Sequence, residues 1–174
     1  MRGRAKGNSD VSLGRALDRA SLALCDLGGW LLLALAGLVN VEIGLRYLLG
    51  GSTLVADEYG GYLFVWLTLL GFGHALRSGQ FLRVEAALER FGPRLRVACA
   101  ALGAAVGLGV AAITTHACYG TVALSLRFNT LSIQPSATPL WLPQAIMSLT
   151  FGWLCILYLD TLVRSLRELF GRRS

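Results

Sequence analysis

The chain has 174 residues, of which 55% are hydrophobic and only 15% are charged. Because soluble domains carry about a quarter charged residues, this composition excludes an ordinary soluble domain and favours a membrane protein. The formal net charge of +6 does not indicate nucleic-acid binding, since Arg and Lys in a membrane protein mark the cytoplasmic ends of its helices.

Residues 11–25 have the pattern of a short amphipathic helix. Leu13, Leu17 and Leu24 fall at helical spacing, and Arg15 lies on the other side of the helix. Such a helix can lie in the headgroup layer with its apolar side toward the acyl chains. The pattern is equally consistent with an extension of the first spanning helix into water, and both arrangements remain open.

The first membrane span is predicted at residues 27–48. A spanning helix needs about 20 apolar residues to cross about 30 Å of hydrocarbon, and the run from Leu27 to Val41 continues through Glu42 and Arg46. These two charges are spaced i,i+4 and can pair on one helical face. Because a lone charge in the bilayer costs about 2.5–3.5 kcal/mol on insertion scales, we interpret them as a structural or subunit-facing pair. The alternative is a proton or ion site at Glu42.

The second span is predicted at residues 59–77. Asp57 and Glu58 directly precede it, where acidic side chains interact favourably with the positive end of the helix dipole. Gly71 allows a neighbouring helix to approach closely. Aromatic side chains typical of membrane-interface anchors occupy the first half of this span, at Tyr59, Tyr62 and Trp66.

Residues 80–91 predict a second interfacial helix. Phe81 and Val84 share one helical face, whereas Arg83 is available to water. We expect this helix to end at Gly92-Pro93, because proline interrupts a helix that has begun before it.

The third span is predicted at residues 95–118. It carries a ridge of small residues at four-residue intervals, a pattern typical of close helix packing in lipid. The ridge consists of Cys99, Gly103, Gly107 and Ala111. Whether its partner lies in this chain or in another protein stays open.

The fourth span is predicted at residues 140–163, after a loop at 127–139 that is rich in Ser, Thr and Pro. Pro139 and Pro143 flank Trp141 at its start. Proline is tolerated in a first helical turn, and Trp141 is a typical interface anchor.

The basic residues predict the topology. Fourteen of the 16 Arg and Lys residues would lie on one side of the membrane, with only Arg46 and Arg127 on the other. By the positive-inside rule, both termini are expected in the cytoplasm. The sequence therefore predicts an all-α membrane protein, a single domain over residues 1–174, with four transmembrane helices and short interfacial amphipathic helices.

Several short motifs occur in a recognisable order along this topology. They are Arg46-Tyr47, Asp57-Glu58, Trp66 with Gly71, the stretch Gly79-Gln80-Phe81-Leu82-Arg83-Val84-Glu85, and Pro139-Leu140-Trp141-Leu142-Pro143. In this order they resemble the signature of the small integral-membrane (DctQ-type) subunit of tripartite ATP-independent periplasmic (TRAP) transporters. The resemblance covers roughly residues 27–165.

The resemblance implies a complex in the bacterial inner membrane. A large permease subunit would carry the substrate and sodium sites, and a periplasmic binding protein would deliver an organic anion such as a carboxylate or sugar acid. The small subunit would scaffold the large one and help to dock the binding protein, with no cofactor and no nucleic acid.

The resemblance, the charge pair and the small-residue ridge together give a set of expected contact residues. Subunit or structural contacts are expected at Glu42, Arg46, Tyr47, Trp66, Gly71, Arg83, Glu85, Gly103, Gly107 and Trp141. Periplasmic docking is expected at Asp57, Glu58 and Arg127.

Other function classes find little support in the sequence. His74 and His116 could suggest a b-type haem, but at 1.5 Å per residue they would lie about 30 Å apart in depth and could not share one. The four cysteines have no paired or metal-binding spacing, and no catalytic motif is present, so we expect neither an enzyme nor a cofactor. The alternatives are a membrane anchor subunit of a redox enzyme and a small autonomous four-helix transporter that uses Glu42.

Overall fold

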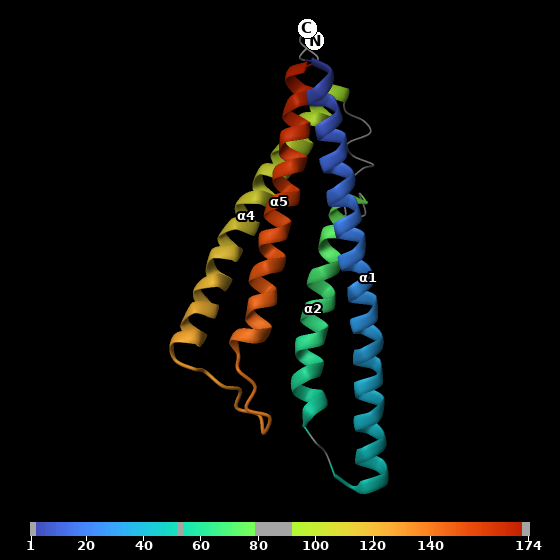
Figure 1. The fold of residues 1–174 in the computed structure, drawn as a ribbon, viewed down its shortest axis with the longest axis vertical. Helices are drawn as coiled ribbons and strands as arrows, with labels where there is room; N and C mark the ends of the chain where they lie inside the picture. The colour runs from blue at the N-terminus through green and yellow to red at the C-terminus, as the bar shows by residue number, and fades with distance from the viewer. Residues whose placement is uncertain (1–2, 52–53, 79–91, 172–174) are drawn as a thin grey trace.

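The computed structural model of the chain describes residues 3–51, 54–78 and 92–171. Four long helices follow one another: α1 (Gly3–Leu49), α2 (Val55–Arg77), α4 (Pro93–Arg127) and α5 (Trp141–Gly171) (Figure 1). Each helix is long and apolar enough to cross a membrane. Within the described ranges the only strand-like pairing is an isolated bridge between Leu131 and Pro139. The predicted all-α membrane protein with four spanning helices is confirmed.

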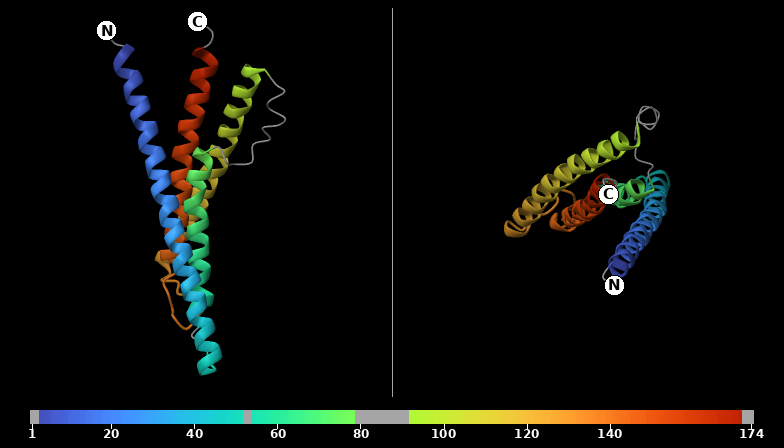
Figure 2. Two further views of the ribbon diagram at one scale, coloured as in Figure 1. Left: turned by 90° about the vertical axis from the view of Figure 1, so that its right-hand side faces the viewer. Right: turned by 90° about the horizontal axis from the view of Figure 1, so that it is seen from above.

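The helices form two antiparallel hairpins that meet along α2 and α5. α1 packs against α2, α4 packs against α5, and α2 contacts α5, so the order across the molecule is α4, α5, α2, α1 (Figure 2). Both chain ends lie at one end of the molecule, which we call the terminal end (Figure 1). The loop of residues 128–140 and the last turns of α1 lie at the opposite end, which we call the loop end. The two chain termini therefore emerge on the same side of any bilayer that the four helices cross.

Local sequence explains where the helices begin. α2 starts directly after Leu54, whose φ of 57° is left-handed, and it carries Asp57 and Glu58 in its first turn. Acidic side chains there stabilise the positive end of the helix dipole. α4 starts at Pro93, a residue tolerated in a first turn because its missing N–H would have no helical partner. The predicted starts of the last three spans lie within about one turn of the observed helix starts.

α1 is one continuous helix, so residues 11–25 are not separate from the first span. It runs without a break from Gly3 to Leu49. Leu17 is buried in the same cluster as Leu154 and Leu157 of α5. The 11–25 segment therefore continues the axis of the first span, which is one of the two arrangements that the sequence left open. The second predicted interfacial helix, at 80–91, lies outside the described residues.

Close contacts define the register between α1 and α2. A Cβ atom on Gly28 would lie 3.2 Å from the carbonyl oxygen of Leu67, and one on Gly60 would lie 3.5 Å from Cδ1 of Leu35. The stretch of α1 beside α2 is therefore centred near Gly28, and α1 continues past the start of α2 at the loop end (Figure 1). The predicted first span, residues 27–48, is displaced from that stretch toward the loop end, and its membrane boundaries stay a prediction.

The buried core lies toward the terminal end, where the helices converge. A Cβ atom on Gly73 of α2 would lie 2.9 Å from Nε1 of Trp153 and 3.2 Å from Cδ1 of Leu157. The missing side chain at this position therefore allows α2 to pack closely on α5. The buried members of the core cluster are Leu17, Leu76, Ala111, Leu154 and Leu157.

α4 packs on α5 through small residues, but only part of the predicted ridge takes part. A Cβ atom on Gly107 would collide with the ring of Tyr158, and Ala111 is buried in the core cluster. Gly103 has no atom within 4 Å of its Cβ position, and Cys99 is exposed. In a helix with 3.6 residues per turn, each residue of such a ridge is rotated by about 40° around the helix axis from the residue four positions before it. Only two neighbouring members of the ridge, Gly107 and Ala111, therefore face α5.

We expect Gly107→Leu to destabilise the chain, because the new side chain occupies the space of the Tyr158 ring. Overpacking of this kind costs about 1–3 kcal/mol. Gly103→Leu, four residues away on the same helix, should have little effect, because its Cβ position is open. Thermal unfolding in mild detergent measures the difference in stability between the two variants. Equal melting temperatures would show that the Tyr158 ring moves aside without destabilising the chain.

Candidate functional site

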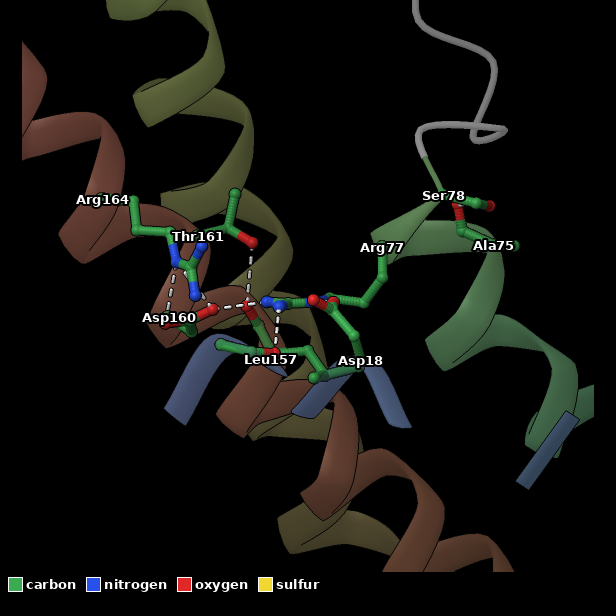
Figure 3. A network of polar contacts seen from close by, with 9 residues as sticks. Asp18, Ala75, Arg77, Ser78, Leu157, Asp160, Thr161 and Arg164 are labelled. Carbon is green, nitrogen blue, oxygen red and sulfur yellow. Dashed lines mark hydrogen bonds and ion pairs between the residues drawn. The ribbon is translucent and has the colours of Figure 1, made fainter. Parts of the chain in front are cut away.

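A polar cluster at the terminal end joins three helices through Arg77, the last residue of α2. Its Nε donates to Oδ1 of Asp18 on α1 at 2.6 Å, and its Nη1 donates to Oδ2 of Asp160 on α5 (Figure 3). Its Nη2 donates to the carbonyl oxygen of Gly14 at 3.0 Å. Arg164 pairs with the same Asp160 carboxylate at 3.0 Å. We call this group the terminal cluster.

Burial makes the terminal cluster energetically important. The Arg77 side chain is only 10% exposed and that of Asp160 only 13%, whereas Arg164 is 48% exposed. A buried charge without its partner is strongly destabilising, but a buried pair with its hydrogen bonds complete is tolerated. Three of the five N–H groups of Arg77, one on each nitrogen atom, donate to an oxygen, so its charge is compensated by two carboxylates and a carbonyl group.

A second polar cluster, at the loop end, fixes the 128–140 loop to α2. The Glu58 carboxylate accepts a hydrogen bond from the Tyr62 hydroxyl at 2.9 Å and another from the Ser136 hydroxyl. At the next residue of α2, the hydroxyl groups of Tyr59 and Thr138 are 3.0 Å apart. Although it lies in the first turn of α2, Glu58 is only 6% exposed, because the loop covers it. We call this group the loop cluster.

The 128–140 loop has an ordered backbone of its own. The N–H of Ser132 donates to the carbonyl oxygen of Thr138 at 2.9 Å, and the N–H of Leu140 donates to that of Thr130 at 3.1 Å. These bonds flank the bridge between Leu131 and Pro139. They hold the two sides of the loop together, so its hydroxyl groups are presented to Glu58 from a defined backbone.

Between the two clusters, α1, α2 and α5 surround an apolar pocket of about 440 Å³. Leu31, Trp66 and Trp153 contribute to its walls, and none of its lining residues is charged. An acyl chain or an apolar side chain suits such a pocket, whereas an organic anion does not. In the described ranges, no group of three or more His, Cys, Asp or Glu side chains is placed to hold a metal ion. The two clusters and the pocket between them suit the joining of helices.

Comparison with known protein families identifies the chain. A family model described as "Tripartite ATP-independent periplasmic transporters, DctQ component" matches residues 35–168, well over half of the chain. The chain belongs to this DctQ family. No curated protein and no solved structure matches it. As a DctQ protein with four membrane-spanning helices, it is a multi-pass integral membrane protein and a small permease component of a TRAP transporter.

The DctQ chain contains the charge pair predicted on α1. Nη2 of Arg46 lies 3.9 Å from Oε1 of Glu42, within one face of the helix. Glu42 is buried and Arg46 is exposed. The neighbouring Tyr47 is 84% exposed, so most of its ring is free to meet lipid or another protein.

The predicted residues on α2 and at the start of α5 take different positions. Trp66 donates from Nε1 to the carbonyl oxygen of Pro143 at 3.3 Å, which links α2 to the first turn of α5. Trp141 is the first residue of α5 and is partly exposed. Asp57 is exposed although its neighbour Glu58 is buried.

Four further predicted positions have open surroundings or fall outside the residues that the structure describes. The guanidinium of Arg127 lies 6.0 Å from the centre of the Phe128 ring, and both side chains are exposed. Among the described residues, Gly71 has no atom within 4 Å of its Cβ position, so it faces away from the other described helices. Arg83 and Glu85 lie outside the described residues.

Sequence reasoning missed the partners of these clusters. From the sequence, Arg77 is only one of the basic residues that predict the topology. Asp160 has no predicted role, although it lies inside an apolar run. An acid at that position was a usable signal, because charges within spanning helices are usually paired. Nothing local marks Ser136, whose role follows from a contact 78 residues away in the chain.

We expect Arg77→Met to destabilise the chain by about 3–5 kcal/mol, because it leaves Asp160 buried without its main partner. Arg164→Met should cost no more than about 1 kcal/mol, since Arg164 is half exposed and, among the described residues, hydrogen-bonds only to Asp160 of its own helix. Unfolding titrations with SDS in mixed micelles measure both values. Combining Arg77→Met with Asp160→Leu should restore part of the stability, and no recovery would mean that the pair is not the source of the loss.

We expect Glu58→Leu to release the 128–140 loop from α2, because Ser136 and Tyr62 lose their common acceptor. Hydrogen exchange of the loop amides should become faster, by about fivefold or more if the loss is about 1 kcal/mol. Asp57→Leu is the matched control, since Asp57 is the adjacent acid but is exposed. Equal exchange in the two variants would contradict a tether through Glu58.

Proposed function

We propose that this chain is the small permease subunit of a sodium-coupled TRAP transporter that imports an organic anion, such as a carboxylate or sugar acid. The observation that carries this proposal is the DctQ family match over residues 35–168. DctQ proteins work with a large permease subunit and a periplasmic binding protein. The large subunit would carry the substrate and sodium sites, and this chain would scaffold it.

The exposed surface of the helices supports a scaffold role. Large apolar side chains remain exposed on three different helices, for example Trp30 on α1, Ile113 on α4 and Leu149 on α5, each more than 70% exposed. In a membrane, this surface faces lipid or another membrane protein. Because the helices pack in the order α4, α5, α2, α1, broad helix faces are left for a partner to bind without breaking the contacts between these helices (Figure 2).

The two polar clusters suit a support for a moving partner. The terminal cluster joins α1, α2 and α5, and the loop cluster joins α2 to the 128–140 loop. The two hairpins are therefore connected at both ends, which resists a hinge motion between them. A large subunit that changes conformation during transport would then work against a fixed frame.

The distribution of charge supports an inner-membrane orientation with cytoplasmic termini. In the sequence, fourteen of the 16 basic residues precede the first predicted span, fall at the end of the second or between the second and third, or follow the fourth, and the positive-inside rule assigns these segments to the cytoplasm. The loop end would then face the periplasm, with Asp57, Glu58 and Arg127 near the membrane surface. Ile133, fully exposed at the tip of the ordered loop, would be available to the binding protein together with Asp57 and Arg127, whereas the buried Glu58 would hold the loop in place beneath it.

The test is to co-express the tagged chain with the large subunit and measure both assembly and transport. We expect a stoichiometric complex in mild detergent, and uptake of the organic anion by proteoliposomes that contain both subunits, the binding protein and an inward sodium gradient. Omitting this chain should abolish uptake. A chain that purifies alone, or uptake that continues without it, would contradict the proposal.

A further inference from the structure

Asp26 on α1 is an exposed acid at the middle depth of the helices. Gly28, two residues further along, packs against the backbone of Leu67, the thirteenth of the 23 residues of α2. α2 is about 34 Å long at 1.5 Å per residue, which is close to the thickness of about 30 Å of a typical hydrocarbon layer. If α2 spans the bilayer, its midpoint therefore lies near the bilayer centre. Asp26 therefore lies within about 5 Å of the bilayer centre if α2 spans it.

Nothing within the described part of this chain neutralises Asp26. No hydrogen bond or ion pair joins it to another described residue, unlike Asp18 and Asp160 at the terminal end. The nearest basic residue on the same helical face is Arg19, two turns and about 10 Å toward the terminal end. Trp30, one turn from Asp26 toward the loop end, is 72% exposed, and Leu22, one turn toward the terminal end, is 48% exposed, so the α1 surface on both sides of the acid is open.

An uncompensated carboxylate at this depth is costly in lipid, and acyl chains cannot compensate it. A second copy of this chain is a poor partner, because a parallel symmetric pair would bring two Asp26 side chains to the same depth. What complements this surface is a transmembrane helix with a basic side chain near its middle.

We propose that Asp26 and the α1 surface around it bind a transmembrane helix of the large permease subunit that presents an Arg or Lys at the same depth. This inference rests on the proposed function and names the face through which the subunits meet. The local shape agrees with it. Gly29 and Gly37 have no atom within 4 Å of their Cβ positions, so a partner helix can approach α1 on either side of Trp30.

The test compares Asp26→Leu with Glu168→Leu in cells that also express the large subunit. Glu168 is the control because it is an exposed acid on the last turns of α5, beyond the core. We expect Asp26→Leu to lower the yield of the two-subunit complex by about tenfold or more, as loss of one member of a buried charge pair does. Glu168→Leu should leave the yield within about twofold, the size of a surface effect.

A second measurement separates a contact with the partner from a role in folding. The amount of Asp26→Leu chain in the membrane should equal or exceed that of the unmodified chain, because no internal contact is lost and Leu is favourable in lipid. A marked fall in that amount would overturn the inference, since Asp26 would then stabilise this chain itself.

A photo-crosslinking amino acid at Trp30 tests the surface directly, with the same amino acid at Leu102 on α4 as the comparison, since Leu102 is also highly exposed. We expect a cross-link to the large subunit from position 30 and a weaker one, or none, from position 102. A cross-link from position 102 alone, or an unchanged complex with Asp26→Leu, would overturn the inference while the proposed function stands. If the unmodified chain forms no complex, the proposed function itself has failed.

Discussion

The packing of α1 and α2 against α5 depends on one guanidinium group. Arg77 ends α2 and reaches carboxylates on two other helices, Asp18 on α1 and Asp160 on α5 (Figure 3). Fixing a long side chain costs conformational entropy, and burying its charge costs desolvation, so the group is tolerated only while its partners are in place. The apolar contacts around Leu17 and Leu157 are brought together by the same helices. Charge pairing and core packing at the terminal end therefore support each other.

Lipid explains why so much of the remaining surface is apolar. Helices in a bilayer gain little from hiding apolar side chains, so they associate through close packing and polar contacts instead. Gly73 and Gly107 allow close packing, beneath Trp153 and Tyr158 respectively. Polar contacts occupy the two ends, in the terminal and loop clusters. A small subunit built in this way can leave broad helix faces uncovered for a partner without losing its own fold.

The register of α1 against α2 decides the depth in the membrane at which the charged residues of α1 lie. Seen along the sequence, Asp26 precedes the first apolar run and Glu42 lies within it. In the structure, the contact of Gly28 with Leu67 brings Asp26 to the middle depth of α2, and Glu42 lies only about two turns before the end of α1. Glu42 pairs with Arg46 there, so the charge that most needs an external partner is Asp26.

The sequence by itself determined the four helices, the approximate starts of the last three and the family, because long apolar runs, bracketing charges and short motifs are local properties of the chain. It also anticipated the Glu42–Arg46 pair, whose spacing lies within a single helix. Only the tertiary structure decided the partners of Arg77, Glu58 and Gly107. Arg77 and Asp160 are 83 residues apart, and Glu58 and Ser136 are 78 apart. Periodicity defines a helix but not which of its faces meets another helix, and that depends on how the four helices rotate and cross when they pack.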